Sequence, residues 1–183
     1  MANKWHVFSA DHEIPGQIMV DFKNAVGADE IIPYFEKHGI TTIDPTIWYP
    51  MQQLLDVYND MAESKGDIMF DFVAIGIKTA EQGIFPPEFA SLPLIAILQG
   101  VPIVFKMNNR GTDIGSVDLE VIDDHHVKFT LRLCQPDDIW YGVFYGYVKR
   151  FSPPGTPFKL YYDNDVPRRD LGGEYTILHI TWG

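Results

Sequence analysis

The sequence predicts an α+β fold in which a run of N-terminal helices is followed by a strand–strand–helix–strand–strand unit. Three observations lead to this prediction. Apolar residues recur at helical spacing up to about residue 107 and alternate with polar residues from residue 116 onward. One long helical segment, 137–151, separates two pairs of alternating segments. Short connections join the segments within each pair, so we expect an antiparallel sheet with helices packed on it.

The N-terminal part predicts an arm and a helical half. Residues 1–14 are expected to form an arm or a short strand at 5–8, and the helical half covers 15–107. Apolar spacing, with Pro at the starts and Gly at the ends, predicts helices at 15–26, 29–37, 51–61, 67–82 and from 88 onward. Pro93 and Pro102 are expected to kink or divide the fifth helix.

The C-terminal part, 116–183, holds the strand–strand–helix–strand–strand half. Period-2 alternation predicts strands at 117–121, 127–133, 158–162 and 175–182. A tight turn is expected at 123–125, where Asp-Asp-His suits a short hairpin. With no linker or low-complexity segment along 1–183, we expect a single domain.

The helix at 137–151 carries the strongest local signals. Asp137 or Asp138 is expected to cap its first turn. Gly142 and Gly146 lie one turn apart inside it, and each costs roughly 1 kcal/mol relative to alanine. We expect this cost to be offset by close approach of the helix to a sheet, a ligand or a second copy of the helix.

Composition excludes several classes of partner. The net charge is −11, from 25 acidic against 14 basic residues, which disfavours nucleic acid and anionic membranes. The apolar window at 89–107 is interrupted by Pro, Gly and Lys, so we expect no membrane insertion. Cys134 is the only cysteine, which rules out an intrachain disulfide. The absence of an N-terminal apolar segment and the lone cysteine favour a reducing, cytoplasmic location.

The segment 127–182 resembles a known superfamily, which joins haem nitric-oxide-binding domains, 4-vinyl-reductase-type domains and the TRAPP subunits of Golgi transport. The resemblance rests on the strand VKFTLRL, on the helix with its two glycines and Arg150-Phe151, and on the closing strand HITW. The upstream IDPTIWYP segment and the five-helix order are also similar. The resemblance implies a small-molecule-binding or dimerising regulatory domain.

The chain departs from the cofactor-binding members of this superfamily. Many 4-vinyl-reductase-type domains carry cysteines at positions that correspond here to Asp137, Arg168 and Thr176. Haem members carry an axial histidine on a helix and a Tyr-x-Ser-x-Arg motif, whereas this chain has no such motif and no histidine between His38 and His125. The cofactor therefore stays unassigned, with haem and zinc both disfavoured.

Motifs that carry chemistry are scarce. The sequence has no G-x-S-x-G, no P-loop and no G-x-G-x-x-G. His125 and His126 are adjacent in an expected hairpin, so they point to opposite faces and need partners from elsewhere to hold a metal. No catalytic residue and no metal ligand is assigned.

The remaining candidates are apolar. An apolar pocket between the helices and the sheet is expected to be lined by Phe72, Phe85, Phe89, Ile97, Phe105, Trp140, Phe144 and Tyr147. Tyr141 and Tyr145 lie off the apolar stripe of their helix and are candidates for a homodimer face. The first hypothesis is a non-enzymatic sensor domain for an apolar small molecule. The alternatives are a homodimeric interaction module without ligand and an enzyme of tetrapyrrole metabolism.

Overall fold

The structure is a computed structural model that describes residues 5–64, 70–83, 85 and 87–183. The N-terminal half pairs two short strands with three helices: β1 (Glu13–Pro15), α1 (Gly16–Val26), α2 (Ala28–Lys37), β2 (Trp48–Pro50) and α3 (Met51–Glu63). β1 and β2 form an antiparallel ribbon. Two more helices follow, α4 (Phe72–Gln82) and, after the 3-10 turn η1 (Pro87–Ser91), α5 (Leu94–Met107).

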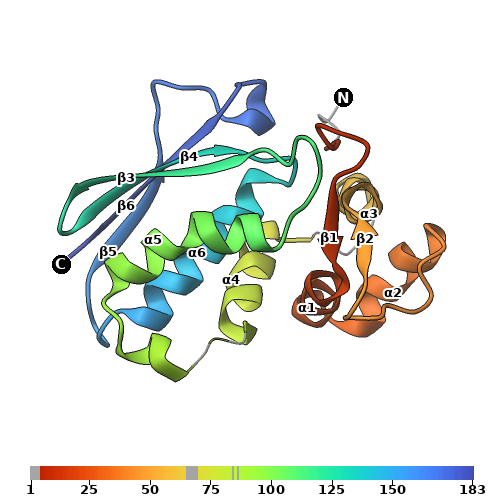
Figure 1. Cartoon of the computed structure of the whole chain (residues 1–183), viewed down its shortest axis with the longest axis horizontal. Coiled ribbons are helices and arrows are strands. Elements are labelled where there is room, and N and C mark those ends of the chain that lie inside the picture. Colours follow the sequence, from red (N-terminus) through yellow and green to blue (C-terminus); the bar gives the residue numbers. More distant parts are fainter. Residues whose placement is uncertain (1–4, 65–69, 84, 86) are drawn as a thin grey trace.

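The C-terminal half is an antiparallel sheet with one helix inserted between its strand pairs. Its elements are β3 (Ser116–Asp123), β4 (His126–Arg132), α6 (Asp137–Phe151), β5 (Phe158–Tyr162), the 3-10 turn η2 (Arg169–Leu171) and β6 (Thr176–Trp182). The strand order is β3-β4-β6-β5. Figure 1 shows α5 and α6 together on one face of this sheet, while α1, α2 and α3 lie beyond one end of it. The predicted α+β class is thus confirmed.

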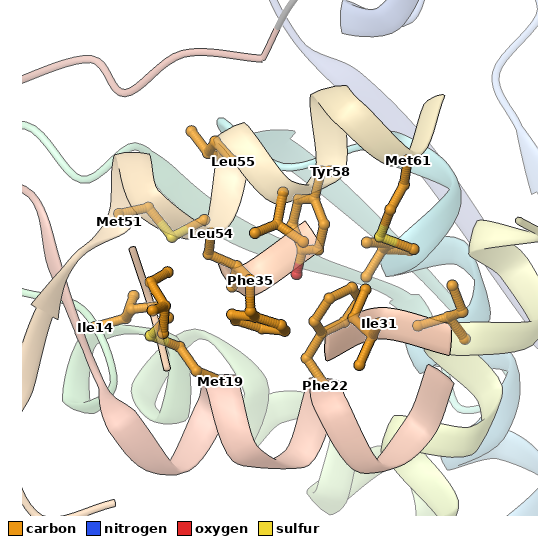
Figure 2. Close-up of a cluster of buried hydrophobic side chains, with 14 of the residues drawn as sticks. Ile14, Met19, Phe22, Ile31, Phe35, Met51, Leu54, Leu55, Tyr58 and Met61 are labelled. Atoms are coloured by element: carbon orange, nitrogen blue, oxygen red, sulfur yellow. The ribbon is translucent and has the colours of Figure 1, made fainter. Parts of the chain in front are cut away.

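Two apolar clusters form the interior. The first joins α1, α2 and α3 with Ile14 of β1, and Figure 2 shows Phe22, Phe35 and Tyr58 meeting at its centre. The second lies between α5, α6 and the sheet, where Phe129 and Phe144 pack at 4.3 Å between ring centroids. Helix α4 contacts both α1 and α6 and so connects the two clusters.

Most predicted elements agree with the structure to within a few residues. Pro93 separates η1 from α5, as expected, but Pro102 lies inside α5 without dividing it. The expected start of the fourth helix at residue 67 lies outside the described residues, and the described part of α4 begins after Asp71, which accepts hydrogen bonds from two first-turn amides. No described helix has both the length and the apolar character needed to cross a membrane.

Candidate functional site

The predicted pocket residues do not lie in one place. Phe105, Trp140 and Phe144 belong to the second apolar cluster, and Ile97 is buried on α5 outside both clusters. Phe72 packs edge-on against Trp5 and Tyr58 beside the first cluster. The structure brings the other three together, because the ring of Phe85 contacts those of Phe89 and Tyr147 at 5.8 and 5.6 Å.

The space beside Gly142 and Gly146 is filled by α4. A Cβ on Gly142 would lie 2.1 Å from the carbonyl oxygen of Val73, and one on Gly146 would lie 2.5 Å from the Cβ of Ala80. The facing Gly76 is equally close to the backbone of α6, 2.1 Å from the carbonyl oxygen of Ile139. The glycines therefore serve a helix–helix crossing within the chain, and the partner is α4 rather than a sheet, a ligand or a second copy.

Tyr141 and Tyr145 contact a strand of their own chain. The hydroxyl of Tyr141 donates to the carbonyl oxygen of Leu160 at 3.0 Å, and its ring packs on Tyr162. The ring of Tyr145 meets that of Phe158 at 5.0 Å. Both rings are half-buried and help to attach β5 to α6.

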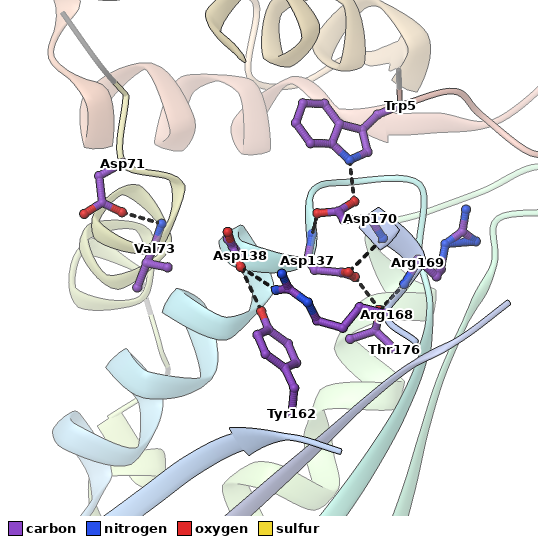
Figure 3. A network of polar contacts seen from close by, with 10 residues as sticks. All are labelled: Trp5, Asp71, Val73, Asp137, Asp138, Tyr162, Arg168, Arg169, Asp170 and Thr176. Atoms are coloured by element: carbon purple, nitrogen blue, oxygen red, sulfur yellow. Dashed lines mark hydrogen bonds and ion pairs between the residues drawn. The ribbon is translucent and has the colours of Figure 1, made fainter. Parts of the chain in front are cut away.

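A buried polar network surrounds the start of α6 (Figure 3). The Asp137 carboxylate accepts hydrogen bonds from the Thr176 hydroxyl at 2.6 Å and from the backbone N–H of Asp170 at 3.0 Å. In return, the Asp170 carboxylate accepts from the backbone N–H of Asp137 at 2.9 Å and from the Trp5 indole at 2.7 Å. The expected cap by Asp137 or Asp138 is wrong: Pro136 is the N-cap residue, and the distant Asp170 supplies the acceptor.

Burial changes the pKa of one carboxyl group in this network. Desolvation, together with the nearby charge of Asp137, raises the pKa of the Asp170 carboxyl. Asp138, one residue further along α6, instead faces a cation and accepts from Arg168 at 2.9 Å and from the Tyr162 hydroxyl at 3.1 Å. Two of the three positions that carry cysteines in 4-vinyl-reductase-type domains, Asp137 and Thr176, are thus joined directly by a hydrogen bond.

An N-terminal arm, residues 5–12, connects this network to both halves of the chain. Its Trp5 backbone exchanges hydrogen bonds with the Asn59 side chain of α3 at 2.9 and 3.0 Å. The ring of Phe8 lies between the guanidinium groups of Arg132 and Arg169, 4.0 and 4.7 Å from its centroid. Residues 5–8 form no strand, so the structure has the arm and not the alternative strand, and side chains hold this arm in place.

The end of the arm contributes a histidine to a buried cluster. His12 Nε2 lies 2.9 Å from Asn109 Oδ1, and His12 Nδ1 lies 3.9 Å from Cys134 Sγ. Cys, His and Asn are the residue types of one class of cysteine hydrolase. Here Cys134 is only 2% exposed, and burial raises the pKa of its thiol to about 12. A buried, protonated thiol is a poor nucleophile, so the cluster is structural.

A groove of about 870 Å³ opens at the other end of α6 from the polar network. Its wall combines the segment before α5, the end of α6, the β3–β4 turn and the end of β6, with Phe85, Leu92, His125, Arg150, Phe151 and Trp182 among its lining residues. The Arg150 guanidinium donates through Nη1 to three carbonyl oxygens at the end of α4, those of Ala80, Glu81 and Gly83. It also lies 4.7 Å above the Phe85 ring, which fixes both groups at the groove wall.

Of the eight expected pocket residues, Phe85 alone lines this groove, and Arg150 is not among them. Leu92 and Trp182 come from segments 90 residues apart in the sequence. The sequence around Leu92 shows only an apolar residue between Pro87 and Pro93, which does not predict a binding site. The meeting of Leu92 with Trp182 depends on the packing of α5 and α6 on the sheet.

Comparisons with known proteins identify the fold. No family model and no curated protein matches the chain. Solved structures do match: an oxygen-binding H-NOX domain related to soluble guanylate cyclases, in its oxygen complex, has a TM-score of 0.66 at 16% identity and covers 91% of this chain and 92% of that one. An H-NOX protein from S. oneidensis in the Fe(II) ligation state has a TM-score of 0.65 at 15% identity, covering 93% and 96%. The chain therefore has the H-NOX fold, as the resemblance implied.

Haem, which this fold implies, does not fit the residues present. The axial ligand of haem members is a helix histidine, and helices α1 to α6 contain none. The buried His12 has Asn109 and Cys134 against its two ring nitrogens. In addition, the backbones of α4 and α6 are in contact at Gly76 and Gly142, which leaves no room for a porphyrin between these two helices. Within the described residues, no group of three or more His, Cys, Asp or Glu side chains is arranged to hold a metal ion.

Proposed function

We propose that the chain is a non-enzymatic regulatory domain that binds an amphipathic small molecule, with an apolar body and an anionic end, in the groove at the end of α6. The observation that carries this proposal is the combination of aromatic walls with the guanidinium of Arg150 in one concave site. The volume of about 870 Å³ lies in the range of small-molecule sites, roughly 300–1,000 Å³. The H-NOX fold of the solved neighbours, one of them an oxygen-binding domain, supports a sensor role.

The lining determines the class of ligand. Phe85, Leu92, Phe151 and Trp182 offer apolar surface to a hydrocarbon or ring system. Arg150 uses Nη1 for its bonds to α4, and the guanidinium has further donors on Nε and Nη2 for a carboxylate or phosphate. The Ser152 hydroxyl, also in the lining, is buried without a hydrogen-bond partner among the described residues. The position differs from the expected pocket, since it lies at the end of the helix and sheet layers rather than between them.

Thermal unfolding with dodecanoate and with uncharged 1-dodecanol tests the proposal. Saturating dodecanoate at about 100 times its Kd stabilises the fold by about 2.7 kcal/mol, which corresponds to roughly 5–11 °C for a domain of this size. The alcohol is expected to give a smaller shift. Leu92→Asp, in the groove wall, should remove the shift, while Ile103→Asp, exposed on α5, should keep it.

A second pair of variants separates the charge from the apolar surface. Arg150→Gln should remove the preference for dodecanoate over dodecanol. Lys149→Gln makes the same change of charge one residue away and should keep the preference, since Lys149 does not line the groove. The proposal fails if dodecanoate produces no shift across its soluble range, or if Leu92→Asp retains the full shift.

The interaction module without ligand is a second candidate, and the exposed side of α5 favours it. Ile103 is 62% exposed and Met107 is 71% exposed, with Val104 beside them. We propose a second copy of the chain as the partner, in a homodimer built on α5 rather than on the tyrosines. Light scattering should then give a dimer for the wild type and a monomer for Ile103→Glu; a monomeric wild type at high concentration would exclude it.

The third alternative is an enzyme of tetrapyrrole metabolism, and we identify no catalytic site for it among the described residues. The buried thiol of Cys134 does not support nucleophilic catalysis. A cytoplasmic location goes with the sensor proposal, because a single unpaired cysteine suits a reducing compartment.

A further inference from the structure

Two histidines meet on the face of the sheet that α5 and α6 leave uncovered. Val127 and Phe129 of β4, like Leu178 and Ile180 of β6, are buried toward the helices. Since side chains alternate along a strand, His126 and His179 point to the opposite face. There His126 Nε2 lies 2.9 Å from His179 Nδ1.

A carboxylate determines which nitrogens carry protons. Asp163 Oδ2 lies 3.5 Å from His179 Nε2, and an ionised carboxylate can only accept, so Nε2 of His179 carries the hydrogen. Nδ1 of neutral His179 is then an acceptor, and His126 donates to it through Nε2. One proton is thus shared in a hydrogen bond between two imidazole nitrogens.

We propose that a divalent transition metal ion of the imidazole-preferring class, Cu²⁺ before Ni²⁺ and Zn²⁺, binds to His126 Nε2 and His179 Nδ1, beside the line that joins these two nitrogens. Two nitrogens in neighbouring positions of a square around copper, each about 2.0 Å from the ion, lie about 2.8 Å apart. The observed 2.9 Å matches this spacing. A tetrahedral zinc ion needs about 3.3 Å and therefore a small opening of the pair.

The surroundings supply the support that such a ligand pair needs. Asp163 bonded to the far nitrogen of His179 is the carboxylate–histidine–metal arrangement that orients a ligand and raises its basicity. The Tyr161 ring stacks on His179 with centroids 5.0 Å apart and an angle of 7° between planes. Lys128, the register partner of His179 on β4, is paired with Glu120. A net charge of −11 also favours cations over the whole surface.

The neutral histidine pair binds the ion without releasing a proton. His126 moves its proton from Nε2 to Nδ1, and His179 keeps its proton on Nε2 against Asp163. The ion binds the two free nitrogens from about 1.4 Å to one side of the line between them, so each ring turns slightly toward it. Water completes the coordination, since within the described residues no third His, Cys, Asp or Glu side chain joins the pair. The result is an open, exchangeable site on the surface.

Titration of the full chain, free of any affinity tag and stripped with chelator, with CuCl₂ tests the site by calorimetry and by electron paramagnetic resonance. We expect one equivalent bound through two imidazole nitrogens. His126→Ala and His179→Ala should each lower the affinity at least tenfold, and Asp163→Asn should lower it 10–100-fold. The matched control is His125→Ala: its ring packs near Trp182 on the neighbouring turn and should not affect binding.

Equal losses from His125→Ala and His126→Ala, or unchanged binding in His126→Ala, would overturn the proposal, because either result means unspecific binding to surface histidines. A spectrum with a single nitrogen ligand would do the same. His126→Gln provides a second variant if an alanine variant unfolds, since it keeps a polar side chain on the open face.

Discussion

The crossing of α4 and α6 gives a quantitative prediction for Gly142→Ala. Alanine gains about 1 kcal/mol of helix propensity over glycine. Against this, the new methyl lies 2.1 Å from the Val73 carbonyl oxygen and 2.9 Å from the Cα of Gly76, and both are backbone atoms that cannot rotate away. Overpacking of this kind costs about 3 kcal/mol, at the upper end of its usual range. The net loss is about 2 kcal/mol, or roughly 4–8 °C in Tm for a domain of this size.

Urea unfolding followed by far-UV circular dichroism measures this change, and α5 offers the matched control. A Cβ on Gly100, which is also inside a helix, meets no atom within 4 Å. Gly100→Ala should therefore stabilise the protein by about 1 kcal/mol. The two alanine substitutions should therefore change the free energy of unfolding in opposite directions. A Gly142→Ala protein as stable as the wild type would refute the reasoning.

A double-mutant cycle examines the same crossing further. Once Gly142→Ala has moved the helices apart, Gly76→Ala meets less resistance, so the double variant should lose less stability than the sum of the two single losses. Additive losses would show that each methyl is accommodated locally, without movement of α4 against α6.

Three further predictions concern the buried polar groups. Thr176→Val removes the hydroxyl that donates to Asp137 and should cost about 2–3 kcal/mol in urea unfolding, whereas Thr130→Val on the open face of the sheet should change stability by less than about 0.5 kcal/mol. The pKa of Asp170 is raised above its ordinary 3.8, so the folded state binds more protons than the unfolded state above that pH. Wild-type stability should therefore fall relative to Asp170→Asn as the pH rises from about 4 toward neutrality, and a rise would contradict the assigned direction. Cys134, with a pKa of about 12 and 2% exposure, should react with a disulfide reagent only at the rate of unfolding, and rapid labelling of the folded protein would count against its burial.

The ββαββ half was predictable because its signals are local. Alternation in 127–133 and the charges and glycines of 137–151 each report on a single element, and the structure places β4 and α6 there. The N-terminal arm was not predictable in the same way. Its Trp5 and Phe8 bind groups more than 50 residues away, namely Asn59 of α3 and Arg132 of β4.

The glycines illustrate what the sequence determined. Gly142 and Gly146 predicted a close approach, since two interior glycines cost helix stability without compensation. The identity of the partner required the tertiary structure, because Gly76 of α4 and Gly142 of α6 meet although they are 66 residues apart in the chain. The same holds for the pocket candidates, of which Phe85 lines the groove while Phe144 fills the core.

Composition and periodicity determined the α+β class, the order of helices and strands and the acidic surface, because each depends on residues close together in the chain. Only the tertiary structure decided which distant side chains meet. It paired Asp137 with Asp170, and His126 with His179, across separations of 33 and 53 residues. Such pairs leave no periodic signal in a single sequence, since the strand register and the loop path that bring them together are set by the packing of the whole domain.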